Sequence, residues 1–224
     1  MKNIILLTTV FFAACGNNTK QVAKDQISDT STTAAVVTER KDTNATSPAI
    51  KQSVDEVAAS NNVVIPGKSI GKVEIGMIDT SLETLFGKPD LSDAAMGKAW
   101  LTWYGKKPDE HNNKTQLDVY TAYKDTSMRD KSVQQIRTTS SFFKTEQNVH
   151  VYSSLDDIQK AFPAIKKVPQ SADDAKKFMV YDDVNNGIAF EIVDANDQQI
   201  CRAIFIHVKG KGVRDIYIAA PSIK

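Results

Sequence analysis

The strongest constraint on the fold is that the chain partly repeats itself after about 76 residues. Residues 72–75 (KVEI) match residues 148–151 (NVHV), and residues 82–87 (LETLFG) match residues 158–163 (IQKAFP). Each copy has a short alternating stretch, typical of a strand, followed by an amphipathic two-turn helix that stops at Gly or Pro. A chain built in this way is expected to fold as two related halves.

A strand-rich stretch follows each predicted helix. Alternating apolar residues place these strands at residues 99–104, 117–123, 133–139, 178–181, 188–193 and 200–208, with a further run at 215–218. Asn186-Gly187 predicts a type I′ hairpin turn, and residues 194–197 predict a second turn. The second helix has a capping box formed by Ser154 and Asp157.

The expected fold class is α+β, with two pseudo-repeats over residues 63–140 and 141–224. Each repeat is a short helical segment followed by an antiparallel β-meander, and the helices pack on one face of the sheet. The two halves would share one extended sheet or form two sheets side by side.

One of these segments resembles a known superfamily. Residues 71–77 (GKVEIGM), a short helix and then residues 85–90 (LFGKPD) are similar to the signature of the β-lactamase-inhibitor-protein-like superfamily. That superfamily includes the small SmpA/OmlA (BamE-type) envelope lipoproteins. The second copy departs from the signature, with Tyr152-Ser153 in place of Gly-Met and Pro163 in place of the helix-ending Gly. The resemblance implies a helix-plus-sheet scaffold that presents a sheet face to protein partners and brings no catalytic residue.

The N-terminus carries the features of a lipoprotein signal peptide. A basic residue precedes a short apolar run, which is about half of what a membrane-spanning helix needs. Residues 12–15 (FAAC) resemble a bacterial lipobox, which implies cleavage after residue 14 and lipidation of Cys15. Several acyl chains would anchor the protein stably in a membrane. Gly16 in place of Asp favours the outer membrane, with the periplasmic or surface face left open; the alternative is an ordinary secretory signal with a chance cysteine.

The stretch after the cysteine is predicted to be a tether. No aromatic residue occurs between Phe12 and Phe86, and residues 16–61 are rich in small polar side chains. Such a stretch cannot bury enough apolar surface to offset chain entropy. Residues 15–62 are therefore expected to be a lipidated, disordered tether, with at most a short transient helix at 53–59.

The residues that could carry chemistry are few and scattered. His111, His150 and His207 lack metal-ligand spacing with any other His, Cys or carboxylate, so no metal and no cofactor are expected. Adjacent carboxylates occur at 156–157, 173–174 and 182–183. The first pair fits helix-end charge, and the third, on a strand, points to opposite faces and lacks the pattern of a calcium loop. Cys201 is expected to be an inert thiol on one strand face with Ala203 and Phe205.

Aromatic residues supply the best candidate for a binding surface, because they dominate the energetics of protein interfaces. The cluster consists of Trp100, Trp103, Tyr104, Tyr120 and Tyr123. Strand alternation places part of this set in the core, so core packing and recognition both remain open. Phe142-Phe143, at the junction of the halves, is expected to pack them together.

The function expected from the sequence is that of a lipid-anchored envelope protein with a non-catalytic domain that binds an unknown envelope protein. The formal net charge of +1 gives no electrostatic reason to bind nucleic acid. Two alternatives remain: a structural or assembly role at the outer membrane, and a small-ligand binder or cryptic hydrolase.

Overall fold

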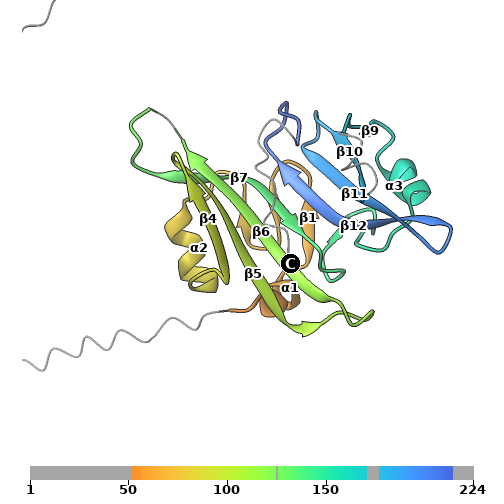
Figure 1. Ribbon diagram of the computed structural model, residues 1–224, viewed down its shortest axis with the longest axis horizontal. Helices are drawn as coiled ribbons and strands as arrows, with labels where there is room; N and C mark the ends of the chain where they lie inside the picture. Colours follow the sequence, from red (N-terminus) through yellow and green to blue (C-terminus); the bar gives the residue numbers. More distant parts are fainter. Residues whose placement is uncertain (1–51, 125, 171–176, 214–224) are drawn as a thin grey trace, which may run out of the picture. The chain divides into compact units, whose positions relative to one another are not determined.

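The computed structural model describes residues 52–124, 126–170 and 177–213, which form a mixed structure of mostly β-sheet with three helices (Figure 1). The helices are α1 (Val54–Ser60), α2 (Asp79–Phe86) and α3 (Leu155–Ala161). The strands are β1 (Val63–Ile65), β2 (Ser69–Ile70), β3 (Val73–Glu74), β4 (Leu91–Ala95), β5 (Lys98–Pro108), β6 (Lys114–Tyr123), β7 (Lys131–Thr138), β8 (Lys144–Thr145), β9 (Lys166–Lys167), β10 (Met179–Asp183), β11 (Ile188–Ala195) and β12 (Gln198–His207). None of the helices in these ranges is long and apolar enough to span a membrane.

Eight strands form one sheet in the order β4-β5-β6-β7-β12-β11-β10-β9. Helix α2 precedes the first four strands in the chain, and α3 precedes the last four. The two sets meet where β7 pairs antiparallel with β12, from Thr138 opposite Ile204 to Gln135 opposite His207. The two sets of four strands therefore form one continuous sheet and not two sheets side by side.

A second, small sheet has the order β3-β2-β1-β8. Its first three strands are antiparallel neighbours in the chain, whereas β8 pairs in parallel with β1, with Val63 opposite Lys144. This pairing ties the segment after β7 to the beginning of the described chain.

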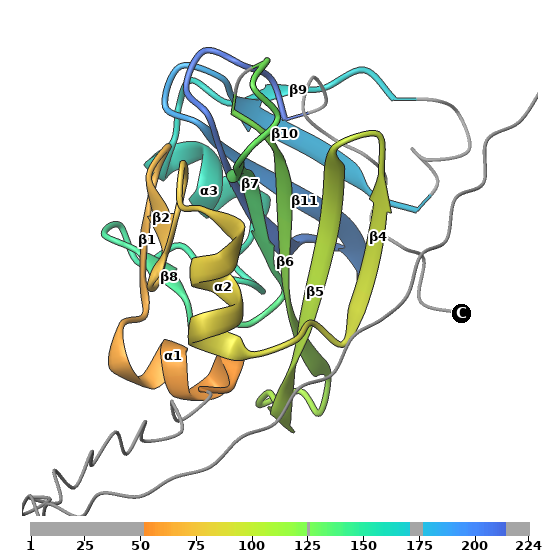
Figure 2. The same cartoon turned by 90° about the vertical axis from the view of Figure 1, so that its left-hand side faces the viewer.

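The main apolar core lies against one face of the eight-stranded sheet, and Figure 2 draws the helices and the small sheet on that side. The three helices contribute Val54, Val57, Leu82, Leu155 and Ile158, among others. The sheet contributes residues that alternate along its strands, such as Leu117 and Val119, Ile188, Phe190 and Ile192, and Ile204 and Ile206. These side chains are at most 6% exposed, so the alternation that predicted the strands also defines the buried face.

The structure differs from the expected tether at its C-terminal end. Residues 54–60 form helix α1, which Ser53 caps at its N-terminus, and Glu56 completes a capping box. Val54 and Val57 are each only 1% exposed. The folded part thus begins before Val63, because apolar residues on one face of α1 are enough to bury it although the segment has no aromatic residue. The signal peptide, Cys15 and the predicted strand at 215–218 lie outside the described residues.

Two local predictions are wrong. Residues 148–151 are not a strand, and His150 makes only an isolated bridge to Lys144. The predicted hairpin at Asn186-Gly187 forms between β10 and β11, but its turn is not type I′, because of Asn186 and Gly187 only Gly187 has a positive φ. The second turn, predicted at residues 194–197, is confirmed: Asn196 (φ 49°) and Asp197 (φ 62°) form the two-residue turn of the β11–β12 hairpin. Asn and Asp tolerate the left-handed conformation better than other side chains, which explains why this turn needs no glycine.

Candidate functional site

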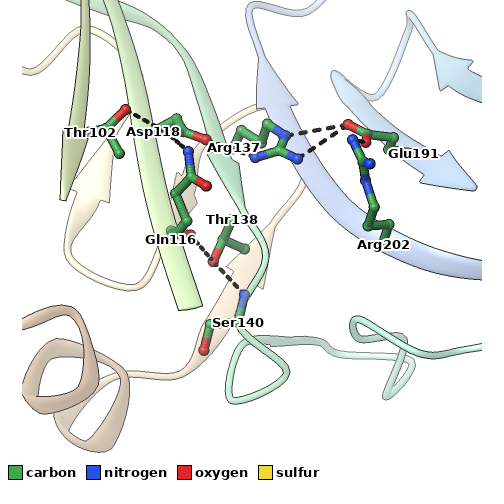
Figure 3. Close-up of polar contacts among 8 residues, drawn as sticks. All are labelled: Thr102, Gln116, Asp118, Arg137, Thr138, Ser140, Glu191 and Arg202. Carbon is green, nitrogen blue, oxygen red and sulfur yellow. Dashed lines mark hydrogen bonds and ion pairs between the residues drawn. The ribbon is translucent and has the colours of Figure 1, made fainter. Parts of the chain in front are cut away.

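The face of the eight-stranded sheet opposite the helices carries a buried ionic network centred on Arg137 (Figure 3). Its Nη1 donates to Asp118 Oδ2 at 2.8 Å, while Nε and Nη2 both donate to Glu191 Oε2 at 3.3 Å. The side chains of Asp118 and Glu191 are 0% and 3% exposed. One guanidinium therefore pairs with two buried carboxylates that come from different halves of the sheet.

The remaining members of the network occupy the free positions around these carboxylates. Thr102 Oγ1 and Gln116 Nε2 donate to Asp118 Oδ1 at 2.7 and 2.6 Å. Arg202, which is half exposed, forms an ion pair with Glu191 Oε1. Two cations balance two anions. Three of the four carboxylate oxygens accept hydrogen bonds, and the fourth, Glu191 Oε1, is paired ionically with Arg202. This arrangement can hold β6, β7, β11 and β12 in register, because shifting any strand would leave a buried charge unpaired.

A second buried pair lies nearby in the same sheet. His207 Nε2 contacts Asp182 Oδ1 at 2.9 Å, and the backbone N–H of Val213 donates to Asp182 Oδ2 at 2.8 Å. His207 is 0% exposed, so this imidazole is satisfied inside the fold. His150 also bonds locally, with Nδ1 at 2.7 Å from the Val151 carbonyl, whereas His111 is exposed. Within the described ranges no group of three or more His, Cys, Asp or Glu side chains could hold a metal ion.

Tyr152 forms a polar contact between the two halves of the chain. Its hydroxyl donates to Asp109 Oδ2 at 2.5 Å and accepts from Asn113 Nδ2 at 2.8 Å. Asp109 also accepts the backbone N–H groups of His111 and Asn113. Burial raises the pKa of Asp109, but these hydrogen bonds lower it more, so the pKa is below its ordinary value. Asp109 is therefore a charged acceptor for the tyrosine at neutral pH.

The backbone of Tyr152 is strained. Its φ is 80°, close to the 86° of Gly76, which lies at the matching position after a shift of 76 residues. A bulky residue rarely adopts this conformation, which costs about 1–3 kcal/mol unless surrounding contacts impose it. The hydrogen bonds to Asp109 and Asn113 are contacts of this kind. The tyrosine that departs from the family-like signature thus has a structural reason to be there.

The pKa of Tyr152 predicts a loss of stability in strong alkali. Burial and the Asp109 carboxylate raise its pKa to about 12, from an ordinary value of 10. A raised pKa stabilises the protonated folded state, so the contribution is fully present below pH 10 and disappears as the pH rises from 10 to about 12. We expect Tyr152→Phe to lower the free energy of unfolding by about 1–2 kcal/mol at pH 8. Urea titrations at several pH values should show this difference shrink towards pH 12; a constant difference would contradict the assignment.

Cys201 lies on the other face from the one predicted. It belongs to the main core with Ile204 and Ile206, whereas Ala203 and Phe205 belong to a smaller cluster on the opposite face. The cause is a β-bulge, which places Cys201 opposite Ile192 and Ala203 opposite Glu191. The alternation rule fails across the extra residue, Arg202.

The thiol of Cys201 is expected to be unreactive in the folded protein. The residue is 0% exposed, and burial strongly raises the pKa of its thiol. Because the thiolate is the reactive form, a thiol reagent should not modify native Cys15→Ala protein in the time in which it modifies the urea-unfolded protein completely. Rapid modification without urea would show that the β11–β12 region opens.

The predicted aromatic surface is not a single surface. Trp100, Trp103 and Tyr120 are only 1–4% exposed, so they act as packing residues. Trp103 packs on Phe86 with ring centroids 5.4 Å apart and donates to the Gly87 carbonyl, while Trp100 packs on Tyr120 on the other face of the sheet. Tyr104 is half-buried under Lys114 Nζ, and Tyr123 is 37% exposed. Tyr123, at the end of β6, lies beside Gly97 before the start of β5, whereas Tyr104 lies further along β5 opposite Gln116, so the two tyrosines do not form one patch.

A shallow hollow of about 200 Å³ lies between α1 and β5. Its lining includes Phe86, Lys88, Asp90, Trp103, Tyr104 and Lys106. Small-molecule sites usually measure roughly 300–1,000 Å³, so this hollow is small for a drug-sized ligand.

Sequence reasoning missed the residues that form the ionic network and the Tyr152 contact. Asp118, Arg137 and Glu191 each lie inside a predicted strand, where a charged side chain among apolar ones is a signal of burial with a partner. The pairing itself depends on which strands are neighbours in the sheet, and the sequence does not show that.

Comparisons with known proteins give little further information. No protein-family model matches the chain, and no curated protein matches it in sequence. Among solved structures, the chain is similar to the uncharacterised protein yfeY from Escherichia coli, with a TM-score of 0.33 and 10% sequence identity. The similarity covers 64% of this chain and 98% of that one. A TM-score of 0.33 is too low to transfer a fold or a function from this neighbour.

Proposed function

We propose that this protein is a lipid-anchored envelope protein whose folded domain binds a protein partner without catalysing a reaction. The observation that carries the proposal is that these ionisable side chains are buried and pair with one another. Arg137, Asp118 and Glu191 bind one another, and His207 binds Asp182, all inside the fold. Side chains held in this way support a rigid scaffold and are not free to act on a substrate.

The domain architecture fits this role. We infer that the fold is an α+β arrangement of two related halves, in which a helix precedes each antiparallel meander and the helices cover one sheet face. This inference is supported by the positions of α2 and α3, which lie at a spacing of about 76 residues, before the two sets of four strands. The similarity of residues 71–90 to the signature of the β-lactamase-inhibitor-protein-like superfamily supports a binding role over a catalytic one.

The lipobox at residues 12–15 supports the anchor, with cleavage after residue 14 and lipidation of Cys15. Residues 16–51 would then connect the lipid to α1. With Gly16 after the cysteine, the outer membrane is the proposed location. An assembly role at that membrane is a narrower form of the same proposal, because it also requires a protein partner.

The test is chemical crosslinking of the full-length, lipidated protein in intact cells, followed by identification of the attached protein. Cys15→Ala serves as the mislocalised control. One envelope protein that is crosslinked to the wild type but not to Cys15→Ala would support both the anchor and the binding role. Crosslinks that do not depend on Cys15, or turnover of a small substrate by the purified domain, would overturn the proposal.

A further inference from the structure

The two edges of the eight-stranded sheet are protected very differently. An exposed edge strand presents unpaired backbone groups, which natural proteins usually guard with Lys, Pro, a bulge or very short length. At one edge, β9 has two residues, Lys166 and Lys167, and is guarded both by charge and by length. At the other edge, β4 has five exposed residues (LSDAA) with no Lys and no Pro, and its pairing with β5 has no bulge.

The turn after β4 shows which of its backbone groups point outward. Met96 (φ 49°) and Gly97 (φ 77°) form a two-residue hairpin loop between the paired residues Ala95 and Lys98. In a hairpin of this kind the residues that flank the loop exchange backbone hydrogen bonds, and such pairs then alternate along the ladder. Asp93 and Leu91 consequently bond to β5, whereas the N–H and C=O groups of Ser92 and Ala94 point away from the sheet.

We propose that β4 binds an extended peptide segment of a protein partner as an added strand of the sheet. The inference rests on the proposed binding function and names the surface and the mode of binding. Backbone groups of Ser92 and Ala94 would pair with the peptide, and this mode needs only an accessible edge strand. Exposed apolar side chains at both ends of β4, Leu91 (40% exposed) and Met96 (99% exposed), would contact apolar residues of the peptide.

Charge defines the chemistry of the peptide and disfavours a second copy of this chain as the occupant. Asp93 is the only charged residue of β4 and lies at its centre. Pairing all five residues of β4 with those of another copy in antiparallel order would place Asp93 directly opposite Asp93, and like charges in that position are destabilising. A peptide with Lys or Arg opposite Asp93 would be stabilised instead.

The test uses two capped, fluorescently labelled peptides, TVTKTVT and TVTETVT, titrated into the full-length protein and followed by anisotropy. We expect the lysine peptide to bind about five- to tenfold more tightly than the glutamate peptide, because of the charge opposite Asp93. Ala94→Pro removes an outward N–H group and should weaken binding at least about tenfold. Ala94→Val, which keeps the N–H group, is the matched control and should bind like the wild type.

A charge exchange provides a second criterion if Ala94→Pro does not fold by circular dichroism. Asp93→Lys should reverse the preference, so that the glutamate peptide binds more tightly. Equal binding to folded Ala94→Pro and wild type, an unchanged preference in Asp93→Lys, or no saturable binding would overturn the proposal. A dimer of the wild type in sedimentation that Ala94→Pro dissociates would also overturn it, in favour of a second copy.

These experiments distinguish a failure of the β4 assignment from a failure of the proposed function. If the Cys15-dependent partner is still crosslinked in cells by Ala94→Pro protein to the wild-type extent, the binding role stands and only the assignment to β4 fails. If the lysine peptide binds β4 as expected and no Cys15-dependent partner is found, the surface stands and the envelope role fails.

Discussion

Replacing Arg137 by alanine is expected to destabilise the folded protein by about 3–5 kcal/mol, the usual cost of removing one partner from a buried ion pair. The Arg137 side chain is 8% exposed, and its guanidinium lies between Asp118 and Glu191. Its removal leaves two buried carboxylates without their shared cation. The free energy of unfolding from urea titration at pH 7 measures the effect directly.

Arg202→Ala is the matched control for this prediction, since Arg202 contacts the same glutamate from a side chain that is 47% exposed. Arg202→Ala leaves Glu191 paired with Arg137, so we expect a smaller loss than in Arg137→Ala, about 1–2 kcal/mol. Arg137→Lys should be intermediate, because one ammonium group cannot reproduce the planar guanidinium that reaches both carboxylates. Equal losses for Arg137→Ala and Arg202→Ala would show that Arg137 is not the centre of the network.

Phe143→Ala is expected to produce a loss of similar size, about 3–5 kcal/mol, because it opens a cavity in the main core. The ring is 0% exposed and belongs to the cluster that joins the helices to the sheet. It packs so closely on Gly71 that a Cβ atom there would lie 2.9 Å from the Phe143 ring. The surroundings therefore have little freedom to collapse into the space that the ring leaves.

Phe142→Ala tests the same chemical change one residue earlier in the chain. Phe142 is 45% exposed, so this substitution should change the free energy of unfolding by less than about 0.5 kcal/mol. Thermal and urea unfolding of the two variants should thus differ sharply. Similar losses in both would mean that neither ring packs as described. The pair was expected as a unit to join the two halves, but only Phe143 has the required burial.

Much of the secondary structure could be predicted from the sequence because the sheet has one strongly apolar face. The six strands predicted by alternation from residue 99 to residue 208 coincide with β5, β6, β7, β10, β11 and β12, and none extends more than one residue beyond its strand. The exposed edge strand β4 was missed for the same reason, since it has no buried face to produce a pattern. The sequence predicts a tether where helix α1 forms, because the apolar residues of α1 are small and few, although its capping box is visible in the sequence.

The candidate sites were harder to predict because they depend on contacts between distant segments. The pairing of Arg137 with Glu191 requires β7 and β12 to be neighbours, and no local pattern specifies this. The role of Tyr152 requires the loop at residues 109–113 to reach the second half of the chain. The prediction of one aromatic surface was wrong because the presence of aromatic residues in a strand does not show whether they pack in the core or face a partner.

The junction of β7 and β12 also determines how this chain would misassemble. Each set of four strands is a meander of hairpins that can form from neighbouring segments, whereas the junction joins residues far apart in sequence. If the halves separated, β7 and β12 would become two long free edges that are complementary to each other. At high protein concentration, the β7 edge of one molecule would meet the β12 edge of another, giving a domain-swapped dimer in which the Arg137–Glu191 ion pair forms between chains.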